Sequence, residues 1–217
     1  MEPPGQQVPP GPVAAVVFDL DGVLVDSTAV VERAWRRWAA EQSVSPEEVL
    51  AVAHGRPARE VVHSFAPHLD AAHEAERLDA WEIEESAELA ALPGVHECVA
   101  LAQRGRWAVV TSGGRELAAG RLAAVGLPQP PVLVTADDVK LGKPHPEPYM
   151  RVRDALAVSA AECLVVEDAP AGITAAKRAG MTVLGVITTH PATALQEADL
   201  LFESMRHVWQ YLRAFQR

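Results

Sequence analysis

Five short, continuously apolar runs constrain the fold of this chain more than any other feature. They lie at residues 14–18, 107–110, 132–134, 164–166 and 182–186. Runs that are apolar throughout, rather than alternately apolar and polar, are typical of parallel strands covered on both faces. Helical patterns that end at or near a glycine lie between them, at residues 96–103, 115–125 and 173–179. This alternation predicts an α/β fold, a doubly wound parallel sheet with a Rossmann-like core.

One long segment breaks the alternation, because it carries helical pattern and no convincing strand. Helices are expected in it at residues 28–42, from Pro46 onward, at 57–65 and at 70–90. We therefore predict a small α-helical cap inserted after the first strand, where it can cover the strand end as a lid. The expected organisation is a flexible tail at residues 1–12, an α/β core domain formed by 13–26 and 93–217, and a helical cap domain at 27–92.

Composition limits the classes of binding partner and the cellular compartment that we expect for this protein. A net charge of -10 argues against nucleic acid or an anionic membrane surface as a partner. No apolar run reaches the length of a membrane span, and residues 1–12 lack the pattern of a signal peptide. Cys98 and Cys163 lie in apolar segments and are expected to be buried thiols. We expect a cytoplasmic protein, a monomer or weak dimer, with a small-molecule partner.

Two carboxylates follow the first apolar run, in Asp19-Leu20-Asp21-Gly22. Side chains alternate along a strand, so Asp19 and Asp21 should share a face. Two acids this close ionise together only if a cation lies between them; otherwise one keeps its proton. The pattern is typical of a site in which one carboxylate attacks and its neighbour transfers protons beside a divalent metal.

Three further polar groups follow predicted strands or occupy a loop between them. In Thr111-Ser112-Gly113-Gly114, a hydroxyl and backbone N–H groups near a helix start indicate an anion site. Lys143, in the loop before Pro144, supplies a positive charge for a phosphate or a carboxylate. Glu167-Asp168 adds oxygen ligands for a hard cation such as Mg²⁺. Because the carboxyl ends of parallel strands form one crevice, we expect all of these groups to converge.

Together, these motifs resemble the four motifs of the haloacid dehalogenase superfamily. The position of the insert resembles the helical cap of its β-phosphoglucomutase-like subgroup. Residues 54–56, 107–113 and 138–149 are similar to glycerol-phosphate and 2-deoxyglucose-6-phosphate type sugar phosphatases. The resemblance implies a phosphoric monoester hydrolase, a Mg²⁺-dependent phosphatase that hydrolyses a small phosphorylated sugar or polyol through an aspartyl-phosphate intermediate.

The resemblance also implies roles for the motif residues. Asp19 would attack phosphorus, Asp21 would protonate the departing alkoxide and then deprotonate water, and Lys143 would neutralise charge between the phosphate and Asp19. The phosphoryl oxygens would be held by the Thr111 hydroxyl and the Ser112 and Gly113 amides. The Mg²⁺ ligands would be Asp19, the backbone carbonyl of Asp21 and Asp168, with Glu167 as a direct or water-linked helper.

Alternatives remain open at this point. A β-phosphoglucomutase-type isomerase or a non-catalytic phosphosugar-binding protein could share this core. The absence of lysine from residues 27–92 favours hydrolysis over the mutase, and the presence of both Asp19 and Asp21 argues against a sensor. In the cap, the resemblance makes His54 and Arg56 candidates for substrate recognition; the alternative is a helix-ending turn with solvated side chains.

Overall fold

A six-stranded parallel sheet forms the centre of the protein, in the order β5-β4-β1-β6-β7-β8. The computed structural model describes residues 13–53 and 55–213, so the expected tail at 1–12 and His54 lie outside the described residues. The strands are β1 (Ala15–Asp19), β4 (Arg106–Val110), β5 (Val132–Val134), β6 (Cys163–Glu167), β7 (Thr182–Val186) and β8 (Leu200–Phe202). The predicted doubly wound α/β fold is confirmed, and β8 is an addition that the sequence pattern missed.

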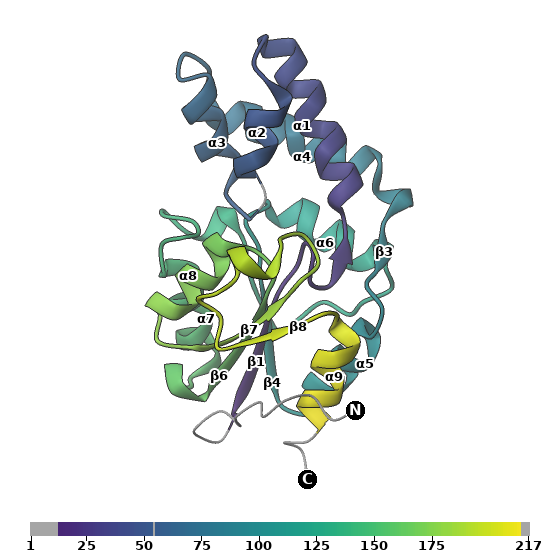
Figure 1. Ribbon diagram of the computed structural model, residues 1–217, viewed down its shortest axis with the longest axis vertical. Coiled ribbons are helices and arrows are strands. Elements are labelled where there is room, and N and C mark those ends of the chain that lie inside the picture. The colour runs from purple at the N-terminus through teal and green to yellow at the C-terminus, as the bar shows by residue number, and fades with distance from the viewer. Residues whose placement is uncertain (1–12, 54, 214–217) are drawn as a thin grey trace.

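Two hydrophobic layers cover the sheet, one on each face. Val16 and Phe18 of β1 belong to one cluster, and Ala15 and Val17 belong to the other, as strand alternation requires. Figure 1 shows α5 and α9 on one side of the sheet and α7 and α8 on the other. The helices of this part are α5 (Val95–Ala102), α6 (Arg115–Ala124), α7 (Glu147–Leu156), α8 (Pro170–Arg178) and α9 (Met205–Arg213). Single turns of 3-10 helix lie at Ser86–Glu88, Ala136–Asp138, Ala160–Glu162 and Ala192–Ala194.

Four helices form a separate body above the sheet (Figure 1). They are α1 (Thr28–Gln42), α2 (Pro46–Ala53), α3 (Ala58–Phe65) and α4 (Ala71–Glu84). Their apolar faces enclose a cluster of their own around Trp38, which is fully buried and donates its indole N–H to Glu74 at 2.9 Å. We refer to these helices as the cap. The domain boundaries at 26/27 and 92/93 stay a prediction.

The connection between cap and core corrects one expectation. The helix predicted over residues 70–90 ends at Glu84, and a short antiparallel pair joins β2 (Val25–Asp26) to β3 (Ala90–Ala91). The expectation of no strand within 27–92 was therefore wrong. The helical pattern of this alanine-rich stretch is a local property, whereas pairing with β2 is a tertiary one that overrides it.

Both cysteines are buried free thiols, as expected. Burial raises the pKa of Cys98 to about 12 and that of Cys163 to about 11. Across the described ranges, no helix is both long and apolar enough to cross a membrane.

The cap cluster leads to a stability prediction. Trp38→Ala removes a fully buried indole and should lower the free energy of unfolding by about 3–5 kcal/mol. Urea unfolding followed by circular dichroism measures the shift in midpoint. Val52→Ala, at an exposed position of α2, is the matched control and should change stability by less than about 0.5 kcal/mol. Equal midpoints for the two variants would contradict the packing of the cap described above.

Candidate active site

The predicted motifs meet at the carboxyl ends of three neighbouring strands. Asp19 ends β1, Thr111 follows β4, and Glu167 ends β6. Because β1 pairs with both β4 and β6, these ends are adjacent. Lys143 reaches the same place from the loop that precedes α7. The expected convergence is therefore what the fold produces.

A buried ammonium group lies between two buried carboxylates. Lys143 Nζ is 2.5 Å from Asp19 Oδ1 and 2.6 Å from Glu167 Oε1, and all three side chains are buried. Burial raises the pKa of Asp19 to about 8; the charge of Glu167 adds to this shift, and Lys143 opposes it. Burial works against the charge of Lys143 as well, but the two carboxylates outweigh it and raise the pKa of Lys143. Two acidic side chains therefore share one ammonium group.

Glu167 has donors on both of its oxygens. Oε1 accepts from Lys143 and from the Tyr149 hydroxyl, the latter at 2.7 Å. Oε2 accepts from the backbone N–H groups of Asp168 and Ala169, at 3.1 and 3.2 Å. These contacts fix Glu167 and, through it, the position of Lys143.

The carboxylate cluster fits a divalent cation. Asp19, Glu167 and Asp168 each offer an oxygen, and these oxygens lie within 4.8 Å of one another. Asp168 Oδ1 is buried without a hydrogen-bond partner, whereas Oδ2 accepts from the Thr189 hydroxyl. Burial, followed by the charge of Asp19, raises the pKa of Asp168 well above its usual value. Buried, crowded carboxylates with an unused oxygen are the donor set that a hard cation requires.

Asp21 is held by donors from three elements. Its Oδ1 accepts from the Ser27 hydroxyl at 2.7 Å and is 2.7 Å from Arg121 Nη1. Its Oδ2 has a longer contact with the Thr111 hydroxyl, at 3.5 Å. Arg121 lies on α6 and its side chain is only 3% exposed. Asp21 is therefore ion-paired with Arg121 through one oxygen and close to the Thr111 hydroxyl through the other.

Residues 111–114, for which the sequence predicts anion binding, contact one another and also the cap. The Gly113 N–H donates to the Thr111 hydroxyl at 3.1 Å, and the Ser112 hydroxyl donates to the Gly55 carbonyl at 3.1 Å. The next residue, Gly114, is the N-cap of α6 and donates its N–H to Asp79 of the cap at 3.1 Å. The motif lies where the cap rests on the core.

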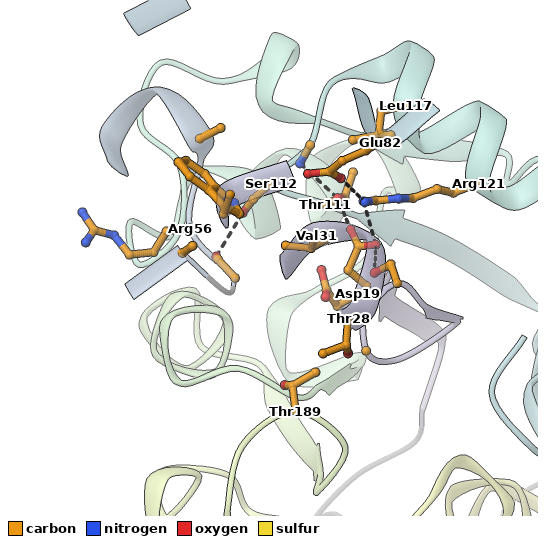
Figure 2. A pocket seen from close by; sticks show the side chains of 18 of the residues that line it. Asp19, Thr28, Val31, Arg56, Glu82, Thr111, Ser112, Leu117, Arg121 and Thr189 are labelled. Carbon is orange, nitrogen blue, oxygen red and sulfur yellow. Dashed lines mark hydrogen bonds and ion pairs between the residues drawn. The ribbon is translucent and has the colours of Figure 1, made fainter. Parts of the chain in front are cut away.

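A pocket opens between the cap and the strand ends (Figure 2). Its core side contains Asp19, Asp21, Thr111 and Asp168. Its cap side contains the apolar side chains of Val31 and Trp35 together with Arg56, Asp79 and Glu82. A pocket with acids and an anion motif on one wall and polar cap groups on the other can hold a phosphate ester with its leaving group toward the cap.

Arg56 lies at the edge of this pocket. Its guanidinium is 3.6 Å from Glu60, and in Figure 2 it points away from Asp19. His54 lies outside the described residues. The predicted roles of both in substrate recognition stay predictions.

The sequence did not point to four residues that line the pocket, namely Thr189, Arg121, Asp79 and Glu82, or to Tyr149, which donates to Glu167. Arg121 carried a usable signal, because it lies on the buried face of α6 with Leu117 and Leu122. A charged residue on an apolar helix face needs a buried partner. Glu82 carried a similar signal, since it follows Leu78 by four residues on the buried face of α4.

Gly172 provides a test of how Glu167 is held. It lies inside α8, and a Cβ there would come within 1.7 Å of Glu167 Oε1. Alanine favours a helix by about 1 kcal/mol over glycine, but overpacking a buried site costs about 1–3 kcal/mol. Gly172→Ala should therefore lower the urea midpoint and also catalytic turnover, because Glu167 must leave Lys143 and Tyr149.

Gly120→Ala is the matched control. Gly120 is also helical, on α6, and a Cβ there would meet no atom within 4 Å. It should raise the unfolding midpoint and leave turnover unchanged. Unchanged turnover and a raised midpoint in Gly172→Ala as well would contradict the tight packing around Glu167.

Comparison with known proteins identifies the family. A family model described as haloacid dehalogenase-like hydrolase matches residues 16–186. Hexitol phosphatase A of Escherichia coli is 41% identical over 197 residues, which cover 88% of this chain and 91% of that protein. Glycerol-1-phosphate phosphohydrolase 2 of Saccharomyces cerevisiae is 36% identical over 201 residues, which cover 85% of this chain and 79% of that protein.

The fold is shared with solved structures. A β-phosphoglucomutase from Clostridium difficile superimposes with a TM-score of 0.81 at 23% identity, covering 94% of this chain and 96% of that chain. The expectation of an enzyme that hydrolyses phosphoric monoesters is confirmed by the relatives, which are phosphatases. Its motifs lie together at the carboxyl ends of the strands, beneath a helical cap. The chain belongs to the haloacid dehalogenase-like hydrolase family.

Proposed function

We propose that this protein is a Mg²⁺-dependent phosphatase that hydrolyses a small phosphorylated sugar or polyol through an aspartyl-phosphate. The observation that carries the proposal is the pairing of buried Asp19 with Lys143 at 2.5 Å, beside the unpartnered oxygen of Asp168. Phosphoryl transfer depends mainly on positioning and on neutralising charge, and these groups supply both.

In the proposed reaction, an oxygen of Asp19 attacks phosphorus and the bond from phosphorus to the leaving oxygen breaks. Lys143 holds Asp19 in place and offsets the negative charge that gathers there. Thr111, Ser112 and Gly113 line the pocket in which the phosphoryl oxygens would lie. Water then cleaves the aspartyl-phosphate, releases phosphate and restores Asp19.

Asp21 would transfer the protons. It would give one to the departing alkoxide and later take one from the attacking water, as a general acid and base. Its position two residues beyond Asp19, at the pocket wall, supports this role.

A bound Mg²⁺ would offset charge on the phosphoryl group and on the acids around it. Asp19, Asp168 and the main-chain carbonyl of Asp21 would hold it, with Glu167 contributing directly or through a water.

The charges of the cap wall support a neutral, hydroxyl-bearing leaving group. Asp79 and Glu82 both line the pocket, and burial raises their pKa values to about 6 and about 7. The charge of Arg121 is shared between Asp21 and Glu82, and Arg56 is near Glu60. A leaving group with its own carboxylate or second phosphate would meet carboxylates here, whereas hydroxyl groups can donate to them.

A substrate panel tests the proposed function. Phosphate release should be rapid with sorbitol 6-phosphate, glycerol phosphate or 2-deoxyglucose 6-phosphate, and at least about tenfold slower with phosphoglycolate or a sugar bisphosphate. Removing metal with a chelator should stop release, and adding Mg²⁺ back should restore it. Metal-independent release would contradict the carboxylate site. Conversion of β-glucose 1-phosphate to the 6-phosphate without release would make the protein a mutase, and binding without turnover would make it a sensor.

Asp19→Asn tests the nucleophile. The amide is isosteric but does not attack phosphorus, so turnover should fall by more than about a thousandfold. Asp154→Asn, at an exposed position at the end of α7, is the matched control and should keep normal turnover. Circular dichroism should show both variants folded. Residual activity above about a thousandth in a folded Asp19→Asn protein would exclude Asp19 as the nucleophile.

A further inference from the structure

Arg121 is a buried cation that the reaction as proposed so far does not use. It lies on α6 in the core, and its guanidinium sits between two carboxylates (Figure 2). Nη1 is 2.7 Å from Asp21 Oδ1, and Nη2 donates to Glu82 Oε2. Asp21 belongs to the core, whereas Glu82 belongs to α4 of the cap. A single side chain thus contacts both the proton-transfer group and the cap.

The same two helices meet at a second point. Asp79 lies three residues before Glu82 on α4 and accepts the N–H of Gly114 at the start of α6. Helix α4 therefore rests on α6 through two carboxylates one turn apart. Asp79 accepts a backbone N–H at the start of α6, and Glu82 contacts the guanidinium that holds Asp21.

The arrangement also selects which oxygen of Asp21 is available. Arg121 and the Ser27 hydroxyl both contact Oδ1, at 2.7 Å each. In the part of the chain that the structure describes, Oδ2 has one hydrogen bond, the 3.5 Å contact with Thr111. A carboxylate that is held at one oxygen by two donors, one of them a rigid planar guanidinium, has a defined orientation at the other oxygen.

We infer that Arg121 is a positioning residue: it fixes Asp21 so that Oδ2 carries the transferred proton, and Glu82 holds the guanidinium in that position when the cap covers the pocket. The inference rests on the proposed role of Asp21 as acid and base. Buried charges are stable only when paired, so withdrawal of α4 would leave Arg121 with one partner fewer and free it to move. Proton transfer is thereby tied to closure of the cap over a substrate.

The test uses two substrates that differ in their need for a proton. Glycerol phosphate releases an alkoxide that must be protonated, whereas p-nitrophenyl phosphate releases a stable phenolate. The ratio of kcat/KM between them reports general-acid catalysis, since kcat/KM includes only steps through formation of the aspartyl-phosphate. Arg121→Met should lower kcat/KM about a hundredfold for glycerol phosphate and about tenfold or less for the aryl ester.

Two variants frame this result. Arg115→Met makes the same change at an exposed position of α6 and should leave the ratio at its wild-type value. Arg121→Lys keeps the charge without the planar fork and should recover part of the loss. Equal losses on both substrates in Arg121→Met would mean a purely structural role and would overturn the inference.

Asp21→Asn separates this inference from the proposed function. For Asp21→Asn, kcat/KM should fall for glycerol phosphate relative to the aryl ester by at least as much as it does for Arg121→Met. If Asp21→Asn shows this selective loss and Arg121→Met does not, only the role of Arg121 is wrong. If Asp21→Asn loses both substrates equally, the acid role of Asp21 fails, and the inference fails with it.

Glu82→Gln tests the link to the cap and keeps the inference testable if Arg121→Met does not fold. The amide oxygen still accepts from Arg121, so the fold should persist while the charge is lost. We expect a selective loss on glycerol phosphate of about tenfold. The Arg121→Met/Glu82→Gln double variant should lose no more than Arg121→Met alone, because Glu82 acts through Arg121. Additive losses, or no selective loss in Glu82→Gln, would contradict the coupling.

Discussion

Buried negative charge at the strand ends is the constraint on which the rest of the structure depends. Asp19, Glu167 and Asp168 are buried close together, and Lys143 is the cation that contacts the first two. Such a cluster is tolerated only where each oxygen has a donor or a cation. Tyr149 and two backbone N–H groups donate to Glu167, and Thr189 donates to Oδ2 of Asp168. The buried Oδ1 of Asp168 accepts no hydrogen bond and is available to a metal.

The same constraint explains how the cap meets the core. Polar contacts join the two at Ser112 with Gly55, at Arg59 with the Val139 carbonyl, and between α4 and α6. The cap has its own apolar cluster around Trp38, while Val30 of α1 packs into the cluster of the core. The charged and polar contacts with α6 fix where α4 rests on the core.

The fold was largely predictable because its strongest signals are local. The apolar runs matched β1, β4, β5, β6 and β7 to within a residue or two, since a strand buried on both faces has no polar positions to obscure it. β8 has three residues, as β5 does, and was nevertheless missed, whereas β2 and β3, of two residues each, are too short to give a pattern. The helix expected over 70–90 was too long, because Ala90–Ala91 pairs with Val25–Asp26, and a pairing between residues so far apart in the chain leaves no local signal.

The sequence by itself determined the sheet, the place of the helical insert and the polar motifs at the strand ends, because each is written in a few consecutive residues. Only the tertiary structure decided which charges meet. Arg121 lies 39 residues from Glu82 and 100 from Asp21 along the chain, so no periodicity within one helix could pair them. A charged residue on the apolar face of a predicted helix is expected to be buried and therefore to need a charged partner. The identity of that partner is set by the packing of α4 on α6.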